Sequence, residues 1–135
     1  MGTKNFIDLF AGCGGLSLGL IKSGWKGVFA IEKTPDAFTT LKHNLIDGKQ
    51  RGFDWPKWLP CKEVTTSELL NDYSSELQCL QGKIDLIAGG PPCQGFSFAG
   101  RRNPSDPRNK LTEEYIELVN IIRPKYLLLE NVKGF

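Results

Sequence analysis

Short apolar runs alternate with segments of helical periodicity along this chain. The runs at 6–10, 27–31, 84–88 and 126–129 predict strands, and apolar residues recur at helical spacing between them. Strands separated by helices pair in parallel, so the alternation predicts an α/β sheet built from parallel units. Because 126–129 is apolar at every position, this last run is predicted to be a fully buried strand.

Capping residues and apolar spacing set the expected helices. These are 16–23, a helix from Pro35 through Leu45, a helix capped among 65–67 that runs through Leu70, and 112–122. Glu113 and Glu114 would lie favourably against the N-terminal dipole of the last helix. No internal repeat interrupts this order, so one domain with one core is predicted for the 135 residues.

Composition excludes several classes of protein. A net charge of +2 is too small to predict nucleic-acid binding by itself. The four cysteines form no closely spaced pair and there is one histidine, so neither a metal site nor a disulfide framework is expected. The N-terminus has no signal-peptide pattern, and no apolar run is long enough to span a bilayer. A reducing cytoplasm therefore fits best.

The segment 48–60 is polar and aromatic, with Phe53, Trp55 and Trp58 among glycines, prolines and lysines. Aromatic and basic residues together could stack on nucleobases. Alternatively, the segment is a surface insertion whose indoles cover a sheet edge, because aromatic clusters usually bury area.

A glycine-rich turn follows the first predicted strand and precedes a helix, as a cofactor loop requires. In Gly12-Cys13-Gly14-Gly15 the glycines permit a tight turn and let a ligand touch backbone amides. Glu32 lies 20 residues after Gly12, where a carboxylate can accept both hydroxyls of a ribose. Ser17 stands where a dinucleotide fingerprint has its third glycine, so a nucleoside without phosphates fits better than a dinucleotide.

A stiff loop follows the run at 84–88, with the sequence Pro91-Pro92-Cys93-Gln94-Gly95-Phe96-Ser97. Two prolines fix φ and remove two backbone donors, so the loop loses little conformational freedom when a substrate binds. A core cysteine would lie within an apolar period, whereas Cys93 lies between prolines and a Gln-Gly pair. Cys93 is therefore interpreted as a nucleophile presented at the end of a sheet.

Three segments together resemble one family. Residues 8–15 (DLFAGCGG), 90–97 (GPPCQGFS) and 130–132 (ENV) strongly resemble the first, fourth and sixth motifs of the cytosine-C5 DNA methyltransferases. The resemblance implies a Rossmann-like, S-adenosylmethionine-dependent methyltransferase fold, with a mostly parallel sheet, helices on both faces and an incomplete C-terminus. Its implied cofactor is S-adenosylmethionine and its implied partner is DNA.

The resemblance also implies roles for individual residues. Phe10 would contact adenine and Glu32 the ribose, although Lys33 stands where the family often has an apolar adenine contact. Glu63 would read the adenine amino group, or is an ordinary surface glutamate. The other implied cofactor-binding residues are those of the turn, which would hold the methionine part, and two beside the cofactor: Ala11, Gly12, Gly14, Gly15, Leu16, Pro92 and Leu111.

The implied chemistry is covalent catalysis on a flipped-out cytosine. A Cys93 thiolate would add to C6, which makes C5 nucleophilic enough to take the methyl group; loss of the C5 proton and of the thiolate restores aromaticity. Glu130 would donate a proton or hydrogen bond at N3, for which it must be protonated. Asp106 and Arg108 look like part of the fifth motif, and loop cations could contact phosphates: Arg101, Arg102, Arg108 and Lys110.

The resemblance covers only the N-terminal part of the family's catalytic domain. The target-recognition region and the last strands have no counterpart in residues 1–135, so the strand ending at Leu129 is expected to be an open edge with uncovered apolar faces. We therefore expect a complementing C-terminal polypeptide or a missing domain, and little activity from the isolated chain. Two alternatives remain: a fragment of a tRNA cytosine-C5 methyltransferase, and a non-catalytic cofactor-binding partner subunit.

Overall fold

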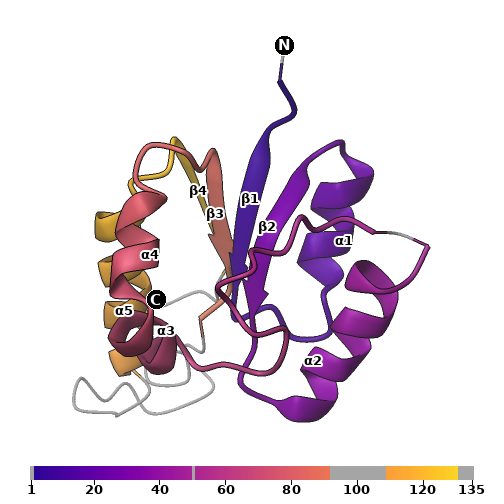
Figure 1. Ribbon diagram of the computed structural model, residues 1–135, viewed down its shortest axis with the longest axis horizontal. Coiled ribbons are helices and arrows are strands. Elements are labelled where there is room, and N and C mark those ends of the chain that lie inside the picture. The colour runs from indigo at the N-terminus through magenta and orange to yellow at the C-terminus, as the bar shows by residue number, and fades with distance from the viewer. Residues whose placement is uncertain (1, 50, 92–108, 131–135) are drawn as a thin grey trace.

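The computed structural model describes residues 2–49, 51–91 and 109–130, which form a parallel sheet between two layers of helices (Figure 1). Four strands pair in the order β2-β1-β3-β4. They are β1 (Asn5–Leu9), β2 (Lys26–Ile31), β3 (Leu86–Gly89) and β4 (Tyr126–Leu129). The predicted α/β fold and all four predicted strands are confirmed.

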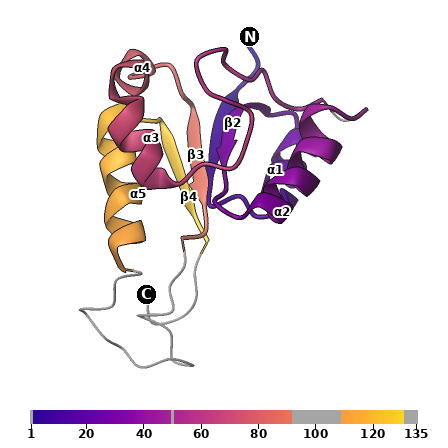
Figure 2. The ribbon, with the colours of Figure 1, turned by 60° about the horizontal axis from the view of Figure 1, so that its bottom comes forward.

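The helices cover both faces of this sheet (Figure 2). One layer holds α1 (Gly15–Lys22) and α2 (Pro35–Leu41), which continues into the π-helical turn η1 (Lys42–Ile46). The other holds α3 (Thr66–Asp72), α4 (Ser74–Cys79) and α5 (Asn109–Ile122). The sequence did not predict α4, and α5 begins three residues before the expected Thr112. None of the helices in the described ranges has the length and apolar character to cross a bilayer.

Alternation along β1 explains why both faces need a helical cover. Phe6 packs in a cluster with Phe38 of α2, whereas Ile7 and Leu9 pack in a second cluster with Leu118 of α5. Successive side chains of a strand point to opposite faces, so a central strand with apolar residues on both faces is buried on both sides. Phe6, Ile7 and Leu9 have no exposed area.

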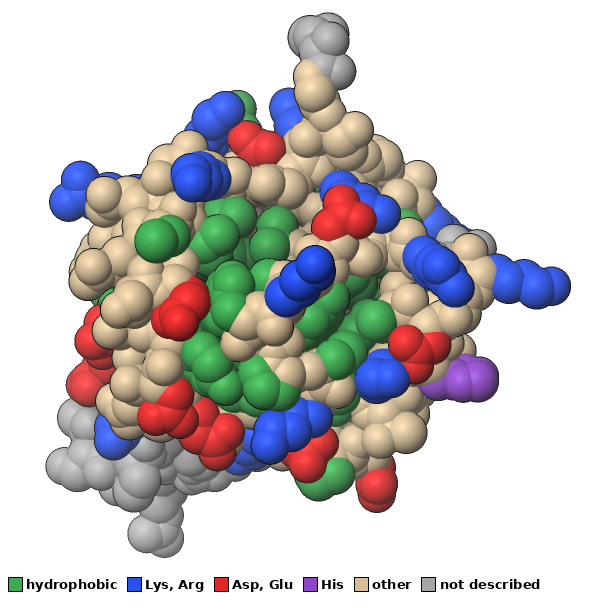
Figure 3. Space-filling model, in the orientation of Figure 1, with side chains coloured by type: hydrophobic (Ala, Val, Ile, Leu, Met, Phe, Trp, Pro, Cys, Tyr) green, Lys and Arg blue, Asp and Glu red, His purple; other side chains and the backbone are tan. Residues whose placement is uncertain are grey.

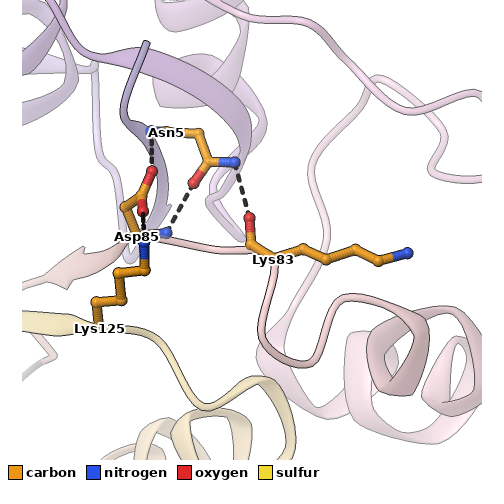
Figure 4. Close-up of polar contacts among 4 residues, drawn as sticks. All are labelled: Asn5, Lys83, Asp85 and Lys125. Carbon is orange, nitrogen blue, oxygen red and sulfur yellow. Dashed lines mark hydrogen bonds and ion pairs between the residues drawn. The ribbon is translucent and has the colours of Figure 1, made fainter. Parts of the chain in front are cut away.

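The amino ends of three strands are joined by a polar cluster (Figure 4). The Asn5 amide donates to Asp85 Oδ2 at 2.9 Å, and the Asp85 amide donates to Asn5 Oδ1 at 2.7 Å. Lys125, which precedes β4, lies with Nζ 3.2 Å from Asp85 Oδ1. The backbone hydrogen bond from Asn5, helped by Lys125, holds the pKa of Asp85 below its usual value. This cluster fixes the register of β1, β3 and β4 at the end of the sheet opposite the candidate site.

The outer edge of β2 is covered by the segment 51–64. Phe53 bridges to Gly27 in parallel, and the Gly27 amide donates to the Gly52 carbonyl at 2.7 Å. The rings of Trp55 and Trp58 meet Phe29 of β2 edge-on. Figure 3 shows apolar side chains gathered over this segment, with charged side chains around them. Of the two interpretations of this aromatic segment, the structure supports the cover over a sheet edge.

The outer edge of β4 has no such cover in the described part of the chain. Its four residues, Tyr126 to Leu129, are 42–56% exposed. The prediction of a fully buried strand is therefore wrong, although the strand itself forms. The physical reason is position: β4 is the last strand of the sheet, so one of its sides and much of both faces meet no described residue. The expectation of an open apolar edge is confirmed for the described residues.

Candidate functional site

A cavity of about 450 Å³ opens at the carboxyl ends of the parallel strands. This is where open α/β sheets bind ligands, and the volume lies within the roughly 300–1,000 Å³ of small-molecule pockets. Its walls come from segments far apart in sequence. They include Phe10 after β1, Glu32 after β2, Gly90 after β3, Thr66 and Ser67 at the start of α3, and Leu111 on α5.

The glycine turn lies between β1 and α1, as the sequence predicts. Gly12 and Gly14 have φ of 59° and 97°, a region that costs an ordinary side chain energy. A Cβ on Gly14 would also lie 2.9 Å from Leu45 Cδ1, so α1 packs closely on the turn after α2. The amide of Ala11 donates to the Ile31 carbonyl at 2.8 Å, which ties the turn to the end of β2.

Phe10 occupies a strained position at the mouth of the turn. Its φ of 57° is uncommon for a non-glycine residue, and such strain concentrates at functional sites. The ring lies nearly parallel to that of Tyr115 on α5, with centroids 6.4 Å apart. Phe10 therefore presents an aromatic surface to the cavity, and its ring is supported by Tyr115 of α5.

Glu32 joins the glycine turn to the end of β2. Its Oε1 accepts a hydrogen bond from the Gly12 amide at 3.0 Å, and its Oε2 accepts one from the Thr34 amide at 2.8 Å. Each carboxylate oxygen has two lone pairs, so each can still accept one hydroxyl. The predicted proximity of Glu32 to the turn is thus present, and the carboxylate lines the cavity.

Asp8 is a buried carboxyl group beneath the turn that the sequence did not single out. It is 1% exposed, and the Ser17 hydroxyl of α1 donates to its Oδ2 at 2.5 Å. Burial raises the pKa of Asp8 to about 7, against the opposing effect of the Ser17 hydrogen bonds. The pair ties the first turns of α1 to β1. The available signal was a lone acidic residue within the apolar run at 6–10.

The cavity gathers some of the predicted cofactor residues and leaves others outside. Phe10, Glu32 and Leu111 line it, and the segment 65–67, predicted only as a helix cap, forms a further wall. Ala11, Gly12, Gly14, Gly15 and Leu16 belong to the turn and the start of α1 rather than to the lining. Glu63 is exposed and is not among the lining residues, although its neighbour Val64 donates to the Glu32 carbonyl at 3.0 Å.

Glu130 lies beside the start of the proline-containing loop. Its amide donates to the Gly89 carbonyl at 3.0 Å, and a Cβ on Gly90 would lie 2.5 Å from Glu130 Oε2. A side chain at position 90 would therefore displace this carboxylate from its present position. Glu130 thus lies at the carboxyl end of β3, beside Gly90, the residue that precedes the two prolines. Several predicted residues lie outside the described ranges: Pro92, Cys93, Arg101, Arg102, Asp106 and Arg108.

Cysteine and acidic residues form no metal-binding arrangement within residues 2–49, 51–91 and 109–130. Groups of three or more His, Cys, Asp or Glu side chains that could hold an ion are not found there. Cys13, Cys61 and Cys79 are free thiols. Among the described residues that line the cavity, the polar side chains are those of Glu32, Lys33, Thr65, Thr66 and Ser67.

Comparison with known proteins gives this site a family. The family model described as C-5 cytosine-specific DNA methylase matches residues 4–135. The chain belongs to that family. The resemblance seen in the three motifs is thereby confirmed, as is membership of an enzyme family.

Named relatives support the same assignment. The chain is 38% identical over 130 residues to the type II methyltransferase M.DdeI of Desulfomicrobium norvegicum, covering 96% of this chain and 28% of that protein. It is 37% identical over 133 residues to the type II methyltransferase M.HgiGI of Herpetosiphon aurantiacus, covering 94% of this chain and 89% of that protein. The chain therefore spans under a third of M.DdeI but most of M.HgiGI.

A solved structure gives the same fold. A crystal structure described as a DNA modification methyltransferase encoded within an E. coli prophage superposes with a TM-score of 0.71 at 33% identity. The match covers 98% of this chain and 33% of the other. The Rossmann-like methyltransferase fold, with its parallel sheet and two helical layers, is thus confirmed.

Proposed function

We propose that this chain supplies the cofactor site and the nucleophile of an enzyme that transfers a methyl group from S-adenosylmethionine to C5 of cytosine in DNA. The observation that carries the proposal is the cavity at the strand ends, where the Glu32 carboxylate contacts the glycine turn beside the strained Phe10. Family membership supports the reaction class. The proposed location is the cytoplasm.

The chemistry of the lining fits a nucleoside. A ribose needs paired hydrogen-bond acceptors, and the two Glu32 oxygens each keep one lone pair. An adenine needs flat apolar contact, and Phe10 with Leu111 offers it. Gly12, Gly14 and Gly15 would approach the methionine part, with Ala11, Leu16 and Pro92 beside them, while Glu63 remains a prediction for the adenine amino group. Lys33 at the rim would face the adenine side.

S-adenosylmethionine, when bound, supplies an electrophilic methyl group. The role proposed for Cys93 is nucleophilic: its thiolate adds to C6 of a flipped-out cytosine and leaves again once C5 has been methylated and has lost its proton. The role proposed for Glu130 is to hold a proton at N3 as negative charge develops on the ring. Its carboxylate lies over Gly90, at the start of the loop that carries Cys93, which supports this assignment.

We also infer that a further polypeptide segment completes the sheet at β4. The apolar strand is exposed, and a cavity of about 200 Å³ between β4 and α5 is lined by Ile116, Val119, Leu127 and Leu129, among others. A strand with apolar residues on both faces is typical of a sheet interior. Relatives such as M.DdeI contain more than three times the matched length. Either a second chain or further residues of a longer protein would serve, and DNA recognition is assigned to that part.

Binding of S-adenosylmethionine by the isolated chain tests the cofactor site. Glu32→Ala is expected to weaken binding about tenfold or more, because it removes charge-assisted hydrogen bonds to the ribose and to Gly12. Glu117→Ala, on the exposed part of α5, is the control of equal charge change. Calorimetric titration measures both, and equal affinities for the two variants would contradict the site.

Trapping on DNA tests the chemistry. The complex or longer protein that contains this chain should form a covalent adduct with an oligonucleotide bearing 5-fluorocytosine, because fluorine cannot leave as the C5 proton does. Cys93→Ser should abolish the adduct. Retention of the adduct in Cys93→Ser would reject Cys93 as the nucleophile, and methyl transfer to tRNA in preference to DNA would favour the alternative substrate.

A further inference from the structure

Glu114 is a buried carboxylate that bridges two helices. Its neighbours Glu113 and Glu117 on α5 are exposed, whereas Glu114 is 6% exposed. The Thr66 hydroxyl donates to its Oε1 at 3.2 Å, and the Ser67 hydroxyl donates to its Oε2. Burying a carboxylate is costly unless hydrogen bonds replace its water, so these two hydroxyls determine where Glu114 can lie.

The residues that Glu114 holds are themselves walls of the cavity. Thr66 and Ser67 open α3 and line the cavity, and Leu111 lines it from α5, three residues before Glu114. Residues three apart on a helix lie on the same side. Glu114 thus sits one turn behind Leu111 and fixes the start of α3 relative to it, across 48 residues of sequence.

A helix cap is a second interaction that holds the start of α3 in place. The Thr65 hydroxyl accepts a hydrogen bond from the Glu68 amide at 3.0 Å and so caps the helix. The cap fixes the backbone of the first turn, and Glu114 fixes where that turn lies. Thr66 is 2% exposed, so its hydroxyl is committed to Glu114 and is not available to solvent.

We propose that Glu114 is a positioning residue for the cofactor: acting through Thr66 and Ser67, it sets the separation between α3 and Leu111 that the adenosine end requires. This rests on the proposed function of the cavity. Glu114 itself touches no ligand. Its removal widens one wall of the site and leaves Phe10 and Glu32 in place.

Affinity for S-adenosylmethionine is the first readout, with Glu117→Ala as the matched control on the same helix. Glu114→Ala should weaken binding about tenfold, since it leaves the buried Thr66 hydroxyl and the half-buried Ser67 hydroxyl without the acceptor that holds the start of α3 in place. Glu114→Gln should weaken it less, because the carboxamide oxygen still accepts one hydroxyl. Ser67→Ala, which removes one donor and leaves the carboxylate, is a milder variant if Glu114→Ala does not fold. Wild-type affinity in both Glu114→Gln and Ser67→Ala would overturn the proposal.

Amide hydrogen exchange of the chain without ligand is the second readout, and it separates this proposal from the proposed function. Glu114→Ala should speed exchange in the first turns of α3 while β1 and β3 keep their protection. Uniform loss of protection would mean a merely structural role and would overturn the proposal. If the wild-type chain binds no S-adenosylmethionine even together with the segment that completes its sheet, the function of the cavity fails. Selective loosening of α3 would then show that the fastening exists without serving this cofactor.

Discussion

Both edges of the sheet are apolar, but the described residues cover only the β2 edge. At the β2 edge, the segment 51–64 adds backbone hydrogen bonds to Gly27 and lays Trp55 and Trp58 against Phe29. At the β4 edge, four apolar side chains are 42–56% exposed. An edge strand with unpaired backbone groups is a template for another strand. The further segment proposed to pair with β4 would account for this difference, whereas the β2 edge is already covered.

The two edges also differ in how their polar groups are satisfied. The Trp55 indole donates to the Leu59 carbonyl at 2.9 Å, so the covering segment closes on itself while its ring packs against Phe38 and Phe53. At β4 the strand is fastened through backbone bonds to β3 and, at its amino end, through Lys125 and Asp85. One edge is therefore held by a packed aromatic cluster, and the other by a ladder and one ion pair.

Truncating one large side chain at each edge should have unequal effects, and this is the largest difference we expect. Trp55→Ala removes a ring that meets three other aromatic rings, and should lower the free energy of unfolding by about 3–5 kcal/mol. Leu129→Ala, at a side chain 43% exposed, should lower it by about 1 kcal/mol or less. Urea denaturation of both variants measures the comparison. Losses of similar size would mean that the β2 cover contributes no more than an open edge does.

Local pattern was enough to predict the strands, because each depends on an apolar run that a sheet must bury. The glycine turn and the position of Glu32 could also be predicted from the sequence. Gly12 and Gly14 indicate the backbone conformation of the turn, and the spacing from Gly12 places Glu32 at the end of the second strand. The exposure of Tyr126 to Leu129 did not follow from this local pattern, which predicted a fully buried strand; the correct expectation of an open edge came from the resemblance to a longer family domain. Burial depends on what lies beside a strand, and a continuous apolar run is typical of a central strand and of an interface alike.

Glu114 and Asp8 show a second limit. Asp8 carried one signal in the sequence, its place within an apolar run, whereas Glu114 was interpreted through the dipole of its helix. That interpretation is wrong, because α5 begins at Asn109 and has no acidic residue in its first turn. The actual partners of Glu114, Thr66 and Ser67, come from another helix and are brought to it by packing of α3 on α5. Contacts of this kind follow from the tertiary arrangement, so no spacing rule predicts them.

A charge placed on the open edge should change association more than folding. Leu127 is 53% exposed, so Leu127→Lys should alter the free energy of unfolding by no more than about 0.5 kcal/mol. Lysine on an edge discourages strand pairing, so the variant should self-associate less than the wild-type chain and lose any complementing partner. Asn120→Lys adds the same charge to an exposed position on α5 and is the control. Sedimentation velocity over a range of concentrations distinguishes them, and identical profiles for all three proteins would argue against an interface at β4.

Acid should slightly reduce the stability that Asp85 contributes at the amino end of β4. The pKa of Asp85 is lowered in the folded chain, first by the backbone hydrogen bond from Asn5 and then by Lys125, so the unfolded chain takes up its proton at a higher pH. The stability that Asp85 provides is therefore complete above the ordinary pKa of 3.8 and is lost as pH falls through the lower folded value. Asp85→Asn should have a lower free energy of unfolding than the wild-type chain at pH 6, and this difference should narrow toward pH 2.

Asp54→Asn is the control at the covered edge. Asp54 is an exposed carboxylate 3.5 Å from Lys26, so its replacement should change the free energy of unfolding by less at every pH. Urea denaturation at a series of pH values measures both differences, and a difference for Asp85→Asn that is constant or widens with acid would show that this carboxylate does not hold the amino end of β4.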